Sequence, residues 1–180
     1  IMKKYYLIIS YIFLLVISTS LAFLPIDRFE ITDAFSLKFK SADPSGSFKK
    51  MEGTIDFNEQ SLETSKFNFS IAISSIKTGN GMRDKKAQTE EWFDAKKYPN
   101  IKFVSKTVVK EGDLYKITGD LTLKGTSKVY VVKAKKSGSG NAISFSGSIN
   151  VNRMDFNIGK KSDVVPDIMK VSFNLPAEKK

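Results

Sequence analysis

An alternation of apolar and polar residues with a period of two recurs from residue 33 to the end of the chain, and it restricts the fold more than any other feature. In segments 35–39 and 66–73, phenylalanine, leucine or isoleucine occupies every second position. Because successive side chains of a strand point to opposite faces, each segment is predicted to be a strand with one buried face. The same pattern marks six further segments: 47–57, 100–109, 114–124, 127–135, 142–152 and 168–176.

Short turn sequences separate these segments, at residues 43–46, 111–113, 124–126 and 137–140. Connections this tight join antiparallel neighbours, whereas parallel strands need long crossovers. The apolar face must be buried, either against a second sheet or by closure of the sheet on itself. Eight strands can close into a barrel that is filled by side chains or holds one small ligand. We predict an all-β fold with an eight-stranded antiparallel barrel, although the alternation alone does not exclude a sandwich.

One long segment, residues 78–98, breaks the alternation. It is polar, contains Gly79 and Gly81, and is compatible with a helix that begins at Thr89 as N-cap and runs to Phe93. We predict a long loop that carries a short helix. Long connections in compact domains are usually functional or disordered. Trp92, the only tryptophan, is expected to dock on the barrel or to cover one of its mouths.

The N-terminal residues have the pattern of a secretory signal. Lys3 and Lys4 precede a nearly unbroken apolar run over residues 5–17, and small residues follow at 20–22. The run is shorter than the roughly 20 residues that span a bilayer. We therefore expect a signal peptide over residues 1–22, cleaved near Ala22, and one domain over residues 23–180 in the periplasm or secreted. With no cysteine in the chain, neither a lipid anchor on cysteine nor a disulfide is available.

The net charge is +10, and loss of residues 1–22 would remove two lysines and no acid, leaving +8. A basic balance can indicate nucleic acid, an anionic membrane or an acidic ligand. The lysines are spread along the whole chain, which favours a solvated surface that keeps strand edges from pairing with other molecules. We expect no nucleic-acid partner. Transient contact with a membrane surface and a homodimer stay open.

Three glycines, Gly53, Gly119 and Gly147, occupy positions where the alternation places an inward side chain. They are either corners at which a strand coils sharply or positions that leave room for a ligand. We favour the corners, and the two interpretations are compatible. The rest of the predicted inner face is phenylalanine, isoleucine, leucine and valine, so any cavity would be apolar and would accept hydrocarbon.

Catalytic groups are scarce in this sequence. Without histidine or cysteine, the usual general base, thiolate nucleophile and soft metal ligands are missing. Arg153 and Asp155 are predicted to form a structural ion pair at a strand end. Asp163 and Asp167 flank Pro166 in a predicted solvated turn. We expect no enzyme, no metal and no cofactor; the rivals to a lipid carrier are a protein-interaction module with a filled core and an enzyme acting on a bound lipid.

Four segments resemble the YceI family of periplasmic polyisoprenoid-binding proteins, which have a lipocalin-like barrel. They are, in order, residues 53–57 (GTIDF), 92–103 (WFDAKKYPNIKF), 118–128 (TGDLTLKGTSK) and 152–159 (NRMDFNIG). The resemblance covers almost all of the chain after residue 22. The family commonly has histidines near positions 85–86 and 124, whereas this chain has lysine there, and Asn157 stands where glycine is usual.

The resemblance implies that a long isoprenoid or a related amphiphilic lipid is bound inside the barrel, for transport or storage and without catalysis. Arg83 resembles a family arginine and could face an anionic head group, although a solvated loop arginine fits equally. Each inward residue is by itself ordinary core, and we expect about half of them to contact the ligand. The predicted ligand-binding residues are Phe35, Phe39, Phe57, Phe69, Ile71, Arg83, Trp92, Phe103, Ile117, Leu121, Phe145, Ile149 and Phe173.

Overall fold

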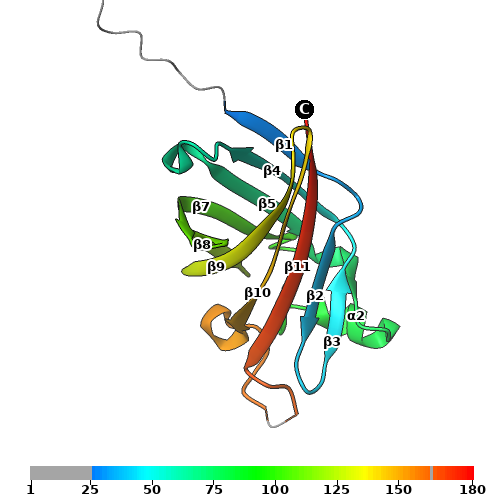
Figure 1. Ribbon diagram of the computed structural model, residues 1–180. Coiled ribbons are helices and arrows are strands. Elements are labelled where there is room, and N and C mark those ends of the chain that lie inside the picture. The colour runs from blue at the N-terminus through cyan, green and yellow to red at the C-terminus, as the bar shows by residue number, and fades with distance from the viewer. Residues whose placement is uncertain (1–25, 163) are drawn as a thin grey trace, which may run out of the picture.

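The computed structural model describes residues 26–162 and 164–180, so the predicted signal peptide lies outside the described residues. The described chain forms an antiparallel barrel with one short α-helix beside it (Figure 1). Its strands are β1 (Asp27–Ile31), β2 (Ser36–Lys40), β3 (Ser45–Phe48), β4 (Met51–Phe57), β5 (Lys66–Ala72), β6 (Ile76–Lys77), β7 (Asn100–Glu111), β8 (Leu114–Leu123), β9 (Thr126–Ser139), β10 (Ala142–Asn152) and β11 (Ile168–Lys179).

Eight strand positions make up the wall, in the order β1-β4-β5-β7-β8-β9-β10-β11, and β1 closes the ring by pairing with β11. The short strands β2, β3 and β6 continue the positions of β1, β4 and β5 toward the other end. Thus β11 pairs with β1 over residues 177–179 and with β2 over residues 170–174. The predicted eight-stranded barrel is confirmed, and the closing pair excludes the sandwich.

All eight predicted segments lie in the barrel, and two strands were missed. β1 and β6 are short, and each shows too little alternation to be distinguished from a loop. The alternation also changes phase along the wall. A bulge between Ser105 and Thr107 moves the buried positions of β7 from odd to even numbers, so that Val108 is buried. In β9 the inward residues are even-numbered, and Val129 and Val131 face outward.

Aromatic rings close one end of the barrel. Phe57, Tyr115 and Phe145 pack edge to face with ring centroids 5.3–5.9 Å apart, and Phe67 lies 5.0 Å from Phe145. All four are at most 6% exposed. Offset and edge-to-face pairs are the favoured aromatic arrangements, and they add to the stabilisation from buried area. This end of the interior is therefore solid core.

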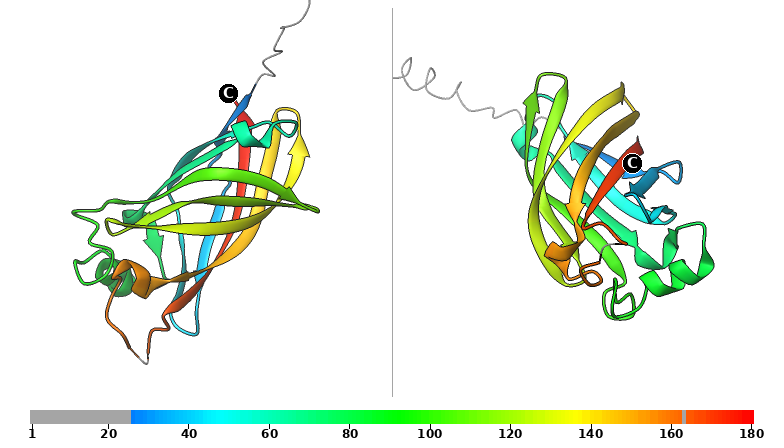
Figure 2. Two further views of the ribbon diagram at one scale, coloured as in Figure 1. Left: turned by 90° about the vertical axis from the view of Figure 1, so that its left-hand side faces the viewer. Right: turned by 90° about the horizontal axis from the view of Figure 1, so that it is seen from below.

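The wall has a seam between β9 and β10. Their pairing runs from Ser139–Ala142 only as far as Ala134–Gly147, although β9 begins at Thr126 and β10 continues to Asn152. The two strands diverge beyond this pair, as both views of Figure 2 show. Tyr130 of β9 stacks at 5.9 Å on Phe156 of the following 3-10 helix η3 (Arg153–Phe156), which bridges part of the seam.

The inward glycines are corners at which neighbouring strands approach closely. A Cβ on Gly147 would lie 2.4 Å from the Lys133 carbonyl oxygen and 2.8 Å from the Phe173 ring. Gly53 is similar, because the Phe69 ring of its cross-strand partner lies over it at 2.4 Å from such a Cβ. Phenyl rings and backbone thus occupy the space that the missing side chains leave, and we find no free room for a ligand at these two glycines.

The helix does not lie where the sequence predicted it. α2 (Gly81–Ala87) precedes Thr89, and its N-cap is Asn80, whose side-chain oxygen accepts hydrogen bonds from the backbone N–H groups of Met82 and Arg83 at 2.9 and 3.1 Å. Thr89 instead donates its hydroxyl to the Lys86 carbonyl at 2.8 Å, just beyond the C-terminus of the helix. Short 3-10 helices η1 (Leu62–Thr64) and η2 (Ile73–Ser75) complete the structure. Within the described ranges, none of the helices has the length and apolarity to span a membrane.

Candidate functional site

A cavity of about 380 Å³ occupies the barrel between the aromatic end and the end that carries α2. This volume lies within the range of ligand pockets. Its wall is almost entirely apolar. Eleven of the thirteen predicted ligand-binding residues line it: Phe39, Phe69, Ile71, Arg83, Trp92, Phe103, Ile117, Leu121, Phe145, Ile149 and Phe173.

Two predicted residues do not line the cavity. Phe57 belongs to the closed end, where it contacts Tyr115 and Phe145, and Phe35 lies before β2, packed against the edge of the core. Period two gives the face of a residue but not its height along the barrel axis, so it could not separate the closed end from the cavity. The same limit explains why several other lining residues were missed: Leu37, Met51, Phe67, Ile101, Leu123, Val151 and Leu175. Phe48 and Val132 were missed because the inward positions of their strands are even-numbered, and Ile76 because β6 was not predicted.

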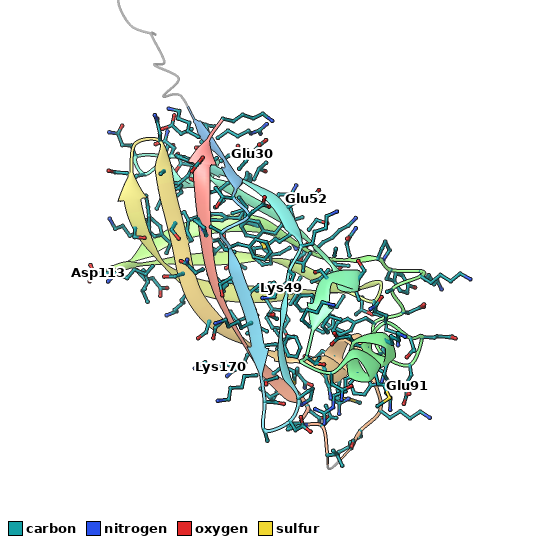
Figure 3. All side chains as sticks on the ribbon, turned by 90° about the vertical axis from the view of Figure 1, so that its right-hand side faces the viewer. Glu30, Lys49, Glu52, Glu91, Asp113 and Lys170 are labelled. Carbon is teal, nitrogen blue, oxygen red and sulfur yellow. The ribbon has the colours of Figure 1, made fainter. Side chains whose placement is uncertain are left out.

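The mouth of the cavity lies at the α2 end. Figure 3 shows Glu91 beside α2, at the opposite end of the barrel from Glu30. The mouth is formed by the β2–β3 loop, α2 with the segments before and after it, and η3 with the loop that follows. The polar lining residues of these elements are Asp43, Thr78, Arg83, Lys86 and Arg153. The polar groups are thus gathered at the rim, while the depth of the cavity is hydrocarbon and phenyl.

Arg83 forms a two-point ion pair across the mouth. Its Nη1 and Nη2 donate to the two carboxylate oxygens of Asp43 at 2.7 and 3.2 Å, and both side chains are about half exposed. The pair ties α2 to the β2–β3 loop. Arg83 therefore lies at the cavity as predicted, but its fork of donors already faces a carboxylate.

Arg153 is buried, with 4% of its side chain exposed, and the predicted partner was wrong. η3 turns three residues per turn, so Asp155 points away and is exposed. All five guanidinium N–H groups have protein acceptors instead. The acceptors are the carbonyl oxygens of Ile158, Lys160, Val165 and Pro166, at 2.9–3.1 Å, and the Asp167 carboxylate, at 2.9 Å.

This network makes Arg153 the support of the loop over residues 158–167, and Asp167 is an ion-pair partner, not the predicted solvated turn residue. Asp163 lies outside the described residues. Lys124 supports the same end: its ammonium group donates to the carbonyl oxygens of Glu91 and Asn157 at 3.3 and 2.9 Å. Asn157 has a φ of 54°, a left-handed conformation in which glycine is the usual residue.

α2 is anchored through Asp84, which is 9% exposed. The backbone N–H and hydroxyl of Thr78 donate to its Oδ1 at 2.8 and 2.7 Å, and Lys77 lies 3.8 Å from Oδ2. The hydrogen bonds from Thr78 hold the pKa of the Asp84 carboxyl below its usual value. The helix is therefore fixed beside the mouth by a carboxylate that stays ionised.

Trp92 docks at the mouth, as predicted for the segment it belongs to. Lys86 lies 6.0 Å and Arg153 5.9 Å from its ring centroid, and the far edge of the ring lies over Gly159. Its Nε1–H is buried and has no hydrogen-bond acceptor among the described residues. The position of Trp92 in the loop predicted that its ring would dock here, whereas no feature of the sequence indicates the unpaired N–H.

Outside the cavity, an exposed apolar strip crosses the wall. Val104 of β7 and Val129 and Val131 of β9 are 45–60% exposed, and they flank Thr118 and Asp120 of β8 through the strand register. In the described part of the chain, no group of three or more carboxylates is arranged to hold a metal ion.

Comparison with known proteins identifies relatives over most of the barrel. Residues 27–177 match the model of the YceI-like domain. UPF0312 protein plu2095 of Photorhabdus laumondii is 37% identical over 127 residues, 67% of this chain and 65% of the relative, so the chain spans just under two thirds of that relative's length. Protein YceI of Escherichia coli O157:H7 is 34% identical over 139 residues, covering 74% and 72% of the two chains.

Solved structures have the same fold. Burkholderia cenocepacia BcnA superposes with a TM-score of 0.73 and 26% identity, covering 84% of this chain and 99% of that one. The Campylobacter jejuni YceI protein gives 0.71 and 31%, covering 78% and 88%. A polyisoprenoid-binding domain from Saccharophagus degradans gives 0.69 at 16% identity, with 87% and 100% coverage, which shows the fold alone. With its sequence motifs, its barrel and the match over residues 27–177, the chain belongs to the YceI-like family.

Proposed function

We propose that this barrel binds the hydrocarbon chain of an isoprenoid-like lipid in its interior and carries or stores it without catalysis. The observation that carries the proposal is the cavity of about 380 Å³ with an apolar wall and a polar rim. Cavities of this kind exclude water and accept hydrocarbon. The Saccharophagus structure has the same fold and is described as a polyisoprenoid-binding domain, which supports a ligand of this class.

The energetics of a chain-shaped ligand support the proposal. Burial of about ten methylene groups at roughly 0.8 kcal/mol each contributes about 8 kcal/mol before the costs of association. Micromolar binding corresponds to about that free energy. The chain of the ligand supplies most of the affinity, and the rim needs to add little more than orientation.

The polar groups argue for binding over chemistry. They lie at the rim, where Arg83 and Arg153 are engaged by carboxylates and carbonyls, and the depth of the cavity offers phenyl and aliphatic groups. A reaction on the bound lipid needs polar groups that converge on the reacting atoms. The export signal expected over residues 1–22 makes the periplasm or the exterior the proposed location, with membrane-surface contact and a homodimer as further predictions.

Two adjacent residues of β9 give a matched test. Val132 lines the cavity, whereas Val131 faces outward and is 45% exposed. Replacement Val132→Trp should fill the cavity and abolish loading, and Val131→Trp should leave loading intact. The measurement is mass spectrometry of lipid extracted from protein purified from its native source, with a defined isoprenoid alcohol added in a second series. Equal lipid content in both variants, or none in the unaltered protein, would contradict the proposal.

The exposed strip of Val104, Val129 and Val131 favours a second candidate, a protein-interaction surface. Under that hypothesis Val131→Trp, not Val132→Trp, would alter association, and the cavity would stay empty. The same pair of variants therefore separates the two functions.

A further inference from the structure

Among the described residues, the rim contains one buried polar side-chain group with no hydrogen-bond partner, the indole N–H of Trp92. Trp92 lines the cavity, and its Nε1 is buried without an acceptor among the described residues. Buried polar groups in native proteins nearly always have a partner, and an exception calls for an explanation. Satisfying such a donor with a ligand atom gains a hydrogen bond and removes the cost of an unpaired group.

The cations of the rim are mostly engaged already. Arg153 uses all five of its N–H groups on protein acceptors. Arg83 is held at two points by Asp43, itself a lining residue that repels anions. Lys86 is the remaining cation on the described lining, and no described carboxylate lies within 4.0 Å of it.

A diphosphate head would have to displace Asp43 from Arg83 or meet Lys86 alone. Phosphate recognition normally uses several charge-assisted hydrogen bonds from a free guanidinium fork or from backbone N–H groups. A single indole N–H suits one acceptor oxygen of an uncharged head instead, because tryptophan donates once and accepts nothing.

Building on the proposed lipid-binding function, we propose that Trp92 recognises the head of the ligand by donating its Nε1–H to an uncharged oxygen, the hydroxyl or carbonyl of an isoprenoid alcohol, ketone or ester. Trp92 is then a specificity-determining residue. The chain of the lipid fills the apolar depth, and the oxygen stays at the rim near Lys86. The lipid is oriented by one hydrogen bond, with its chain toward the aromatic end.

The test uses the full folded protein and three probes that share one chain: geranylgeraniol, the hydrocarbon lacking its hydroxyl group, and geranylgeranyl diphosphate. Because Trp92 is the only tryptophan, its indole N–H gives a single resonance in a ¹⁵N-correlated NMR spectrum. The alcohol should move this resonance strongly and the hydrocarbon only weakly. Trp92→Phe, which keeps an aromatic ring and removes the donor, should weaken binding of the alcohol about threefold to tenfold. Binding of the hydrocarbon should not change.

Tyr98→Phe is the matched control, because it removes one polar atom from the same segment at a residue that does not line the cavity. Unchanged alcohol affinity in Trp92→Phe, an equal loss in Tyr98→Phe, or tighter binding of the diphosphate than of the alcohol would overturn the proposal and leave lipid binding standing. Failure of all three probes to bind would instead contradict the proposed function itself. Urea unfolding of each variant shows that its fold is intact.

Discussion

Replacement of Arg153 by methionine tests the strongest interaction at the mouth. The side chain is 4% exposed and its five N–H groups hold four carbonyl oxygens and the Asp167 carboxylate. Five hydrogen bonds at a net value of about 1 kcal/mol each give about 5 kcal/mol. Removal of one partner of a buried ion pair costs about 3–5 kcal/mol, which agrees. The variant should lose a large share of the roughly 5–15 kcal/mol that stabilises a typical domain.

Urea unfolding followed by circular dichroism measures the loss. With a slope of about 1–3 kcal/mol per molar urea, the midpoint should fall by at least about 1 M. Arg28→Met is the matched control: Arg28 also pairs at two points with a carboxylate, Asp56, at 2.6 and 2.9 Å, but 60% of its side chain is exposed. Exposed pairs contribute little, so its midpoint should hardly move. Equal midpoints for the two variants would refute the argument from burial.

Three further predictions concern the barrel wall. Gly147→Val should lower the free energy of unfolding by about 1–3 kcal/mol through overpacking. Gly81→Ala should be tolerated, because a Cβ there meets open space. Equal urea midpoints for the two variants would contradict the interpretation of Gly147 as a corner of the barrel. Burial, and then the bond to Glu59, raise the pKa of Tyr115 to about 12 from 10. The neutral Tyr115 side chain therefore contributes its full stabilisation below pH 10. Between pH 10 and 12 the free energy of unfolding should decline by about 2–3 kcal/mol, and urea titrations should show a smaller decline in Tyr115→Phe. Ser105→Ala, by removing the acceptor of the Phe67 N–H at 2.8 Å, should cost about 1–3 kcal/mol of unfolding free energy, and an unchanged midpoint would argue against that hydrogen bond.

Period-two alternation predicted the barrel because strand faces repeat with the geometry of the backbone itself. It placed eight segments and most of the cavity lining, including Phe69, Ile71 and Phe103, which share the inner face of β5 and β7. It could not predict which inward rings meet at the closed end, since Phe57 and Phe39 have the same local pattern. That difference arises from pairing between residues distant in sequence, Phe57 with Asp27 and Phe39 with Val171.

The mouth was harder to predict for a related reason. Helix α2 begins after Asn80, whose side chain caps two N–H groups, and this local signal competed with an equally plausible cap at Thr89. The partner of Arg153 is fourteen residues away in Asp167, and nothing local favours it over Asp155. Side-chain contacts between loops depend on the closure of the whole barrel, which a short pattern does not contain.

Because of the seam between β9 and β10, the barrel wall should deform more easily near the mouth than at the aromatic end. Beyond the Ala134–Gly147 pair no ladder joins β9 to β10, so moving these strands apart breaks no backbone pairing and is opposed mainly by side-chain contacts such as Tyr130 on Phe156. Cavity-lining residues flank the seam on both sides, Val132 on β9 and Ile149 on β10. We therefore expect the barrel to widen more easily near its mouth than at its aromatic end and, under the proposed function, to admit hydrocarbon chains of different thickness.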